Sequence, residues 1–108
     1  MAAKEVPDLS VVVPCFNVAA NLSPLVARLI PVLDATGRSY ELIFVDDGSR
    51  DGTLSLARSL AADDERIGVI ALSRNFGKEI AISAGLDHAR GRGVVIIDAD
   101  LQHPPELV

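Results

Sequence analysis

Acidic side chains follow two of the apolar runs in this sequence, at the point where each run ends. Asp46 and Asp47 come directly after the second run, and Asp98 and Asp100 close the fourth. Carboxylates gathered in one place repel one another unless a cation or hydrogen-bond donors lie among them. Such oxygens suit Mg²⁺ or Mn²⁺, which share their shell with water and substrate phosphates, and Gln102 offers a further neutral oxygen. The acids therefore indicate a divalent-cation site that takes a phosphorylated small molecule.

Each acidic pair also has a simpler interpretation. Asp98 and Asp100 could be solvated acids at the end of a strand, because a lone Asp-x-Asp is common. The segment 46–49 could be a turn in which Asp favours the bend and Gly48 accepts a positive φ. We expect this turn to form while Asp47 faces the ligand, where its carboxylate can accept a hydrogen bond from a base N–H.

Aromatic and basic residues follow the other apolar runs. Phe16 comes soon after the first and offers an apolar face on which a base could lie, with an ordinary core position as the alternative. Arg74 and Lys78 follow the third run. Lys78 opens the next helical pattern, where free backbone N–H groups also favour anions. We interpret both cations as candidates for steadying a diphosphate, against the alternative of solvated surface charge.

These residues need a parallel sheet to bring them together. Four apolar runs, each apolar on both faces, alternate with three helical patterns, so the predicted order is βαβαβαβ with right-handed crossovers. The predicted strands are Leu9–Val13, Tyr40–Val45, Ile67–Leu72 and Gly93–Ile97. In such sheets ligands bind beyond the carboxyl ends of the strands, near the point where the strand order reverses. The fold class is therefore α/β, a parallel Rossmann-like sheet with helices on both faces.

The helical patterns carry their own boundary signals. Ser23-Pro24 is the expected cap and first turn of the first helix, and Pro31 should kink it or end a first segment. Asp51-Gly52-Thr53 is the expected start of the second. The helical stripes are, in chain order, Leu22, Leu25, Val26, Leu29, Ile30 and Leu33; Leu54, Ala57, Leu60 and Ala61; and Ile80, Ala81 and Ala84, followed by His88 or Ala89. The segment 104–108 reads as the beginning of a further helix.

Composition excludes several classes of function. The net charge of −5 argues against binding the backbone of a nucleic acid. The one cysteine, Cys15, excludes an internal disulfide, suits a reducing compartment and is expected to be buried. No apolar run approaches the ~20 residues that cross a bilayer. There is no Gly-x-x-x-x-Gly-Lys loop and no early Gly-x-Gly-x-x-Gly, which disfavours nucleoside triphosphatases and dinucleotide dehydrogenases.

Three segments together resemble glycosyltransferase family 2. They are Val12-Val13-Pro14-Cys15-Phe16-Asn17, Asp46-Asp47-Gly48-Ser49-Arg50-Asp51-Gly52-Thr53 and Asp98-Ala99-Asp100-Leu101-Gln102-His103-Pro104-Pro105-Glu106. The sequence is most similar to the dolichyl-phosphate mannosyltransferase and bactoprenol glucosyltransferase branch, which the segment 72–79 also supports. One departure is that Val18 stands where that branch often has an acid.

The resemblance implies a GT-A fold and inverting transfer of a sugar from a UDP- or GDP-sugar, with Mg²⁺ or Mn²⁺ as cofactor. It implies donor contacts at Pro14, Phe16, Val45, Asp47, Asp98 and Ala99, to which our interpretation adds Lys78. It implies that Asp100 and Gln102 bind the cation that bridges the diphosphate, where the metal acts as a Lewis acid. The acceptor implied by this branch is a polyprenyl phosphate, whose own phosphate is the nucleophile.

The resemblance also has implications for the domain organisation and the cellular location of the protein. We expect residues 1–108 to be the nucleotide-sugar-binding part of a glycosyltransferase domain truncated at its C-terminus, soluble and poorly active alone. The longer protein would be cytoplasmic, at the inner face of the membrane. Whether it forms a homodimer is left open by the sequence. Open alternatives are a family member with a polysaccharide or protein acceptor and a non-catalytic nucleotide-binding module. A sugar nucleotidyltransferase is disfavoured because no Gly-rich loop follows the first strand. A receiver domain is disfavoured because its acids follow the first and third strands, whereas here they follow the second and fourth.

Overall fold

The computed structural model describes residues 6–99, which form an alternation of strands and helices. The order is β1 (Leu9–Cys15), α1 (Ala19–Ala35), β2 (Tyr40–Asp46), α2 (Thr53–Asp63), β3 (Ile67–Ala71), α3 (Lys78–His88) and β4 (Gly93–Ile96). The predicted βαβαβαβ order is confirmed, and the strand boundaries differ from the prediction by at most two residues. The further helix predicted at 104–108 lies outside the described residues.

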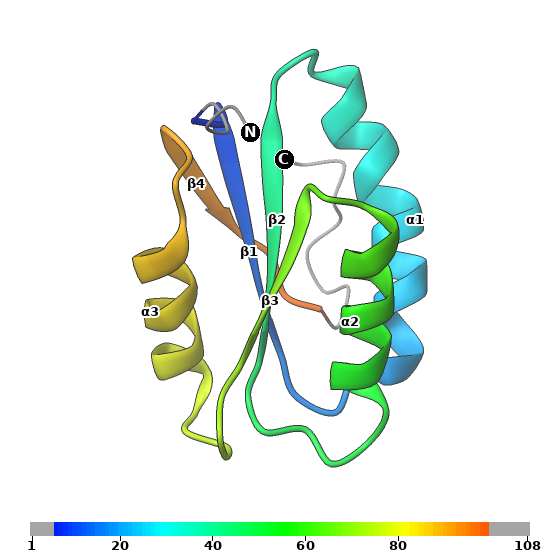
Figure 1. Ribbon diagram of the computed structural model, residues 1–108, viewed down its shortest axis with the longest axis vertical. Helices are drawn as coiled ribbons and strands as arrows, with labels where there is room; N and C mark the ends of the chain where they lie inside the picture. Colours follow the sequence, from blue (N-terminus) through cyan, green and yellow to red (C-terminus); the bar gives the residue numbers. More distant parts are fainter. Residues whose placement is uncertain (1–5, 100–108) are drawn as a thin grey trace.

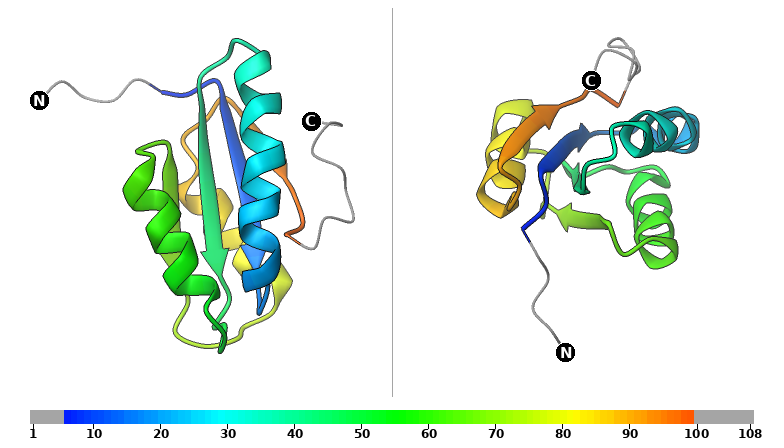
Figure 2. Two further views of the ribbon diagram at one scale, coloured as in Figure 1. Left: turned by 90° about the vertical axis from the view of Figure 1, so that its right-hand side faces the viewer. Right: turned by 90° about the horizontal axis from the view of Figure 1, so that it is seen from above.

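The four strands form one parallel sheet in the order β3-β2-β1-β4. Helices α1 and α2 cover one face and α3 covers the other, as Figures 1 and 2 show. The chain moves outward from β1 to β3 and then crosses to the far side of β1 to form β4. The strand order therefore reverses between β1 and β4, which is where a ligand crevice is expected in this class of fold.

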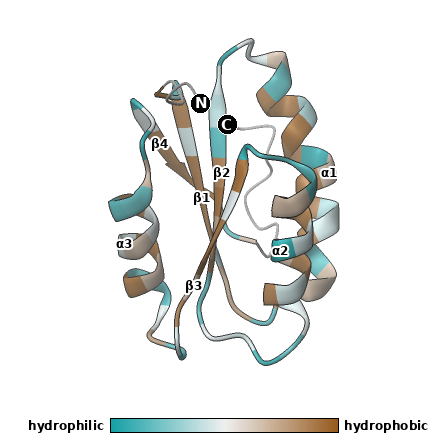
Figure 3. Ribbon diagram, in the orientation of Figure 1, coloured by the Kyte–Doolittle hydropathy of each residue, from teal (hydrophilic) through white to brown (hydrophobic). Residues whose placement is uncertain are grey.

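The apolar runs are buried as the sequence predicts, although not equally. Val11, Val13, Leu42 and Phe44 pack against α1 and α2, while the smaller cluster beneath α3 includes Val12. Figure 3 shows how hydrophobic the strands are along their length. The two edge strands are the exception to burial on both faces: Val94 and Ile96 of β4 are exposed because α3 packs on β1 and β2 instead.

Helix α1 begins earlier than its sequence signals predict. Ser23-Pro24 is not its cap, because the helix starts at Ala19 and its N-cap residue, Val18, forms no side-chain cap. The exposed backbone donors are satisfied from another loop: Thr53 Oγ1 accepts the Val18 N–H at 2.9 Å, and Asp51 accepts the Ala19 N–H at 3.3 Å. Pro31 lies inside the helix and does not end it. It is exposed, so the carbonyl that loses its partner can meet water.

Helix α3 contacts the sheet through small residues. Ala81 and Gly85 are its buried positions, whereas Ile80, predicted to face the core, is half exposed. A Cβ at Gly85 would overlap the side chain of Val12 and crowd that of Val45. The helix therefore approaches β1 and β2 too closely for larger side chains, and the apolar stripe read from the sequence was wrong at Ile80.

Within residues 6–99, no helix is both long enough and apolar enough to cross a membrane.

Candidate functional site

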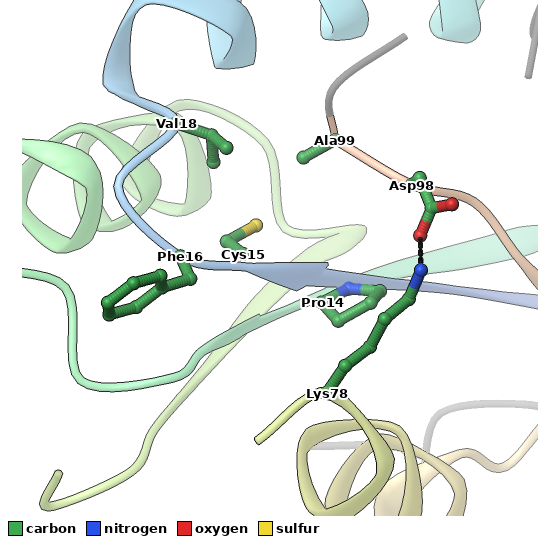
Figure 4. Close-up of a pocket in the computed structure, with 7 residues that line it drawn as sticks. All are labelled: Pro14, Cys15, Phe16, Val18, Lys78, Asp98 and Ala99. Atoms are coloured by element: carbon green, nitrogen blue, oxygen red, sulfur yellow. Dashed lines mark ion pairs between the residues drawn. The ribbon is translucent and has the colours of Figure 1, made fainter. Parts of the chain in front are cut away.

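A pocket lies at the carboxyl ends of β1 and β4, where the strand order reverses (Figure 4). Its lining residues come from three segments: the end of β1 and the loop after it, the first residue of α3, and the segment after β4. They are Pro14, Cys15, Phe16, Val18, Lys78, Asp98 and Ala99. We call this the switch-point pocket. Five of the seven residues predicted to contact a donor lie around it, although they are up to 85 positions apart in the sequence (99 − 14).

The charged residues of this pocket form an ion pair across it. Lys78 Nζ lies 2.5 Å from Asp98 Oδ1, and Figure 4 shows the lysine side chain extending past Pro14 to reach it. The lysine side chain is 59% exposed and that of the aspartate 16%. Because one cation and one anion face the same space, the pocket can offer a positive charge to a phosphate and an oxygen acceptor to a hydroxyl.

Phe16 stands between the switch-point pocket and a second hollow. The second hollow, which we call the loop pocket, is lined by Phe16, Asn17, Gly48, Arg50, Ser73, Arg74 and Asn75. Phe16 is 46% exposed, so it does not belong to the core. The guanidinium of Arg74 lies 4.7 Å from the centre of the Phe76 ring, and Arg74 also lines the loop pocket. An aromatic face with cations on either side can accommodate a base and a phosphorylated tail.

Asp47 lies behind these pockets and is 97% buried, with 3% of its surface exposed. Its Oδ1 accepts the Phe76 N–H at 2.8 Å, and its Oδ2 accepts the Gly77 N–H at 3.1 Å and Asn75 Nδ2 at 3.1 Å. The donors that balance this buried carboxylate therefore come from the loop before α3. Direct contact between Asp47 and a base stays a prediction.

The rest of the turn after β2 holds the loop after β1. Ser49 Oγ accepts the Asn17 N–H at 2.9 Å, and Asn17 Oδ1 accepts the Arg50 N–H at 2.8 Å. Together with the bonds from Asp51 and Thr53 to the start of α1, these contacts fix the loop that carries Phe16. The Asp-Gly-Ser-Arg-Asp-Gly-Thr segment thus has an architectural role that its spacing alone does not reveal.

Two predicted features lie beneath the pockets rather than in them. Val45 is fully buried beside Val12 and Ala81 under α3, and it lines neither pocket. Asp46 serves the turn, since its Oδ2 accepts the Ser49 N–H at 3.3 Å, while its buried Oδ1 has no hydrogen-bond partner among the residues described. Contact between Val45 and a donor stays a prediction.

Cys15 is buried, as predicted, and lines the switch-point pocket. Burial raises the pKa of its thiol to about 12, and the negative charge of Asp46 adds to the effect. The thiol therefore stays protonated near neutral pH and is a poor nucleophile. Cys15 and Val18 were not predicted as lining residues. Their apolar character gave no signal, although both flank Phe16 in the first motif.

The predicted metal ligands, Asp100 and Gln102, lie outside the described residues. Among residues 6–99, no group of three or more His, Cys, Asp or Glu side chains is arranged to hold a metal ion. The acids that are described have other partners: Asp47 has backbone and amide donors, and Asp98 has Lys78. The two predicted ligands, Asp100 and Gln102, would offer a carboxylate and an amide oxygen, which is a donor set that suits Mg²⁺ or Mn²⁺.

Comparison with known sequences decides the family. The sequence model described as glycosyl transferase family 2 matches residues 10–108. The chain belongs to glycosyltransferase family 2. Among family members, an uncharacterized glycosyltransferase of Synechocystis sp. is 50% identical over 101 residues, which cover 94% of this chain and 32% of that protein. An undecaprenyl-phosphate 4-deoxy-4-formamido-L-arabinose transferase of Shewanella sediminis is 42% identical over 101 residues, covering 93% and 30%. The chain spans about a third of the length of these relatives.

Solved structures of glycosyltransferases share the fold. A mannosyltransferase from Pyrobaculum calidifontis, in complex with GDP-Man and Mn²⁺, has a TM-score of 0.69 and 31% identity over 89% of this chain and 28% of its own. Staphylococcus aureus TarS, in complex with UDP-GlcNAc, has a TM-score of 0.71 and 26% identity over 86% and 26%. The prediction of a family 2 member with a parallel α/β sheet of the GT-A type is confirmed.

Proposed function

We propose that the protein containing this chain is an inverting glycosyltransferase that moves a sugar from a nucleoside-diphosphate donor to a polyprenyl phosphate. The observation that carries the proposal is the switch-point pocket, because Phe16, Lys78 and Asp98 meet there from three separate segments. Support also comes from the GDP-Man and UDP-GlcNAc complexes of the similar structures and from the names of the undecaprenyl-phosphate transferases among the relatives.

In this proposal the donor lies along the edge formed by the two pockets. The base rests on the exposed face of Phe16, with Pro14 beside it, and the ribose or sugar hydroxyls donate to Asp98 next to Ala99. The ammonium of Lys78 exchanges its contact with Asp98 for one with a diphosphate oxygen, which carries more negative charge. Arg74, at the rim of the loop pocket, can supply a second cation.

The chemistry is a displacement at the anomeric carbon. An oxygen of the acceptor phosphate forms a bond to that carbon as the carbon–oxygen bond to the diphosphate breaks, and the diphosphate leaves with the electron pair. Because the acceptor is already an anion, no side chain is needed to remove a proton from it. Lys78 binds the leaving group and lowers its charge as that charge develops. A divalent cation held by Asp100 and Gln102 would supply Lewis-acid stabilisation of the same diphosphate.

Calorimetric titration tests donor binding. UDP and GDP are each titrated into the chain with and without Mn²⁺, for the unaltered sequence and for Asp100→Ala. We expect binding that requires Mn²⁺ and that Asp100→Ala abolishes. Equal affinity in both proteins would remove Asp100 from the site, and no binding of either nucleotide under any condition would contradict the proposed donor.

The acceptor needs a separate assay. The protein containing this chain is supplied with labelled sugar donor, Mn²⁺ and polyprenyl phosphate, and the lipid is extracted. We expect label in the extracted lipid with an inverted anomeric configuration. Transfer to a polysaccharide or a protein, with none to the lipid, would overturn the choice of acceptor while leaving the donor site intact.

A further inference from the structure

A residue with a left-handed backbone follows Phe16 directly. Asn17 has a φ of 52°, and among residues 6–99 it is the one residue other than glycine with a positive φ. This conformation is costly for most side chains, although asparagine tolerates it better than the others. A residue keeps such a conformation only when the structure around it holds it there.

The turn after β2 holds Asn17 through two hydrogen bonds. The Asn17 N–H donates to Ser49 Oγ at 2.9 Å, and the Asn17 side-chain oxygen accepts the Arg50 N–H at 2.8 Å. Glycine at this position could adopt the same φ without accepting from Arg50, whereas alanine could do neither without strain. Substitution can therefore separate the two contributions of Asn17, which are its backbone conformation and its side-chain oxygen.

The conformation of Asn17 determines where Phe16 points. In a strand that continued past Cys15, residues 16 and 18 would face the same side. Instead Phe16 is exposed between the switch-point pocket and the loop pocket, while Val18 packs against the hydrophobic core. Figure 4 shows the two side chains leaving the loop in different directions. The turn at Asn17 separates them and leaves the Phe16 ring at the rim of both pockets.

The loop that carries Phe16 is short and is held at both ends. Residues 16–18 alone join β1 to α1. The Cys15 carbonyl accepts a backbone N–H from the turn after β2 at 2.8 Å, and the Val18 N–H donates to the first residue of α2 at 2.9 Å. Because neither end can move freely, a change of φ at Asn17 has to be taken up by Phe16.

We propose that Asn17 is a positioning residue, which acts on the donor through the place that it gives to the Phe16 ring. This inference rests on the proposed function, in which the base lies on Phe16. Asn17 also lines the loop pocket, so direct contact between Asn17 and the donor is the competing explanation. The two explanations differ in one respect: a positioning residue affects nucleotide affinity only while Phe16 is present.

NMR of the chain without nucleotide tests the positioning of Phe16. The ring of Phe44, which is buried in the core, serves as an internal reference. We expect Asn17→Ala to shift and broaden the Phe16 ring signals, and Asn17→Gly to change them less, because glycine keeps the positive φ. Asn21→Ala is the matched control, since it removes an asparagine side chain from inside α1.

Two results of this experiment would overturn the inference. One is a set of Phe16 signals that stays unchanged in Asn17→Ala while the Phe44 signals show that the variant folds. The other is a change in Asn17→Gly as large as that in Asn17→Ala, since the backbone conformation would then not matter. If Asn17→Ala does not fold, Asn17→Asp takes its place as the comparison for Asn17→Gly, and it should leave the Phe16 signals nearly unchanged because it keeps a side-chain oxygen.

A double-mutant cycle tests the effect on the donor. UDP and GDP affinities are measured in Mg²⁺ for Asn17→Ala, Phe16→Leu and the double variant, and the upfield shift of the base protons reports stacking on the ring. If Asn17 acts through Phe16, Asn17→Ala costs roughly fivefold in affinity, which is part of what base stacking contributes, and reduces the upfield shift. Beside Phe16→Leu, the same substitution should cost close to nothing.

The cycle separates failure of this inference from failure of the proposed function. Additive losses in the double variant would show that Asn17 contacts the donor itself, and would overturn the inference. If neither nucleotide binds the unaltered chain while the Phe16 signals still move in Asn17→Ala, the proposed function fails and the positioning of Phe16 by Asn17 stands.

Discussion

Lys78 and Asp98 form an ion pair of 2.5 Å that joins the start of α3 to the segment after β4. The two residues come from elements on opposite sides of the point where the strand order reverses, so their contact spans the mouth of the switch-point pocket. In the proposed function this pair places the Lys78 ammonium where the diphosphate would lie. When no diphosphate is bound, the same ammonium balances the charge of Asp98. Much of the proposed donor chemistry depends on this arrangement.

Removing the cation should weaken nucleotide binding. We expect Lys78→Met to lower the affinity for UDP and GDP roughly tenfold, because a charge-assisted hydrogen bond to a phosphate is lost. Arg58→Met is the matched control, since it removes one positive charge from the exposed side of α2. The measurement is calorimetry in low and moderate salt. Equal effects of the two substitutions would mean that overall charge, not the position of Lys78, matters.

The turn after β2 should tolerate no side chain at Gly48. Its φ is 71°, and a Cβ there would overlap the backbone of Arg74 and Asn75. We expect Gly48→Ala to lower the free energy of unfolding by about 2–4 kcal/mol, from the strained φ together with the overlap. Gly37 is a matched control with a φ of 69° and open space around it, so Gly37→Ala should cost only about 1 kcal/mol. Urea unfolding measures the free energy of unfolding of both variants. Equal losses in the two variants would show that Gly48 is not packed against the backbone of Arg74 and Asn75.

Alkaline pH should destabilise the fold. The pKa of Cys15 rises from 9.0 to about 12 through burial and the nearby Asp46, and that of Tyr40 rises from 10.0 to about 12 through burial and its hydrogen bond to Asp34. Both pKa values are higher in the folded state, so this stability is fully present below pH 9.0 and is lost as the pH rises towards 12, because the unfolded chain releases these protons first.

We expect the free energy of unfolding to fall by at least about 1 kcal/mol over that range, and Cys15→Ala to delay the onset to near pH 10, where Tyr40 alone remains. Urea unfolding at a series of pH values measures the effect. A free energy that stays level from pH 9 to 11 in the unaltered chain would contradict the burial assigned to both groups.

The sequence predicted the sheet and the edge at which its polar residues gather, because β-branched runs and the acids that follow them are local signals. It could not show what each acid contacts. Contact between Asp47 and a ligand stays a prediction, but nothing in the sequence indicated that its oxygens accept N–H groups from a loop 28 to 30 positions away. Hydrogen bonds over such distances leave no periodic pattern in the sequence.

The same limit explains the errors in the helices. The cap of α1 was placed at Ser23-Pro24 because these are local capping residues, but Asp51 and Thr53 satisfy the helix start from a distant turn. Ile80 was placed in the core by its spacing, whereas the close approach of Gly85 to Val12 turns a face of small residues toward the sheet. In both cases tertiary contacts overrode a local preference.

The most direct test of the account is an NMR titration of the isotope-labelled chain with UDP and with GDP in the presence of Mg²⁺. We expect the largest chemical-shift changes at Phe16, Lys78, Asp98 and Ala99, which line the switch-point pocket. We expect little change at Ser39, Arg66 and Gly68, which line a hollow at the opposite end of the sheet. Changes centred on that opposite hollow, or none at the switch-point pocket at saturating nucleotide, would contradict it.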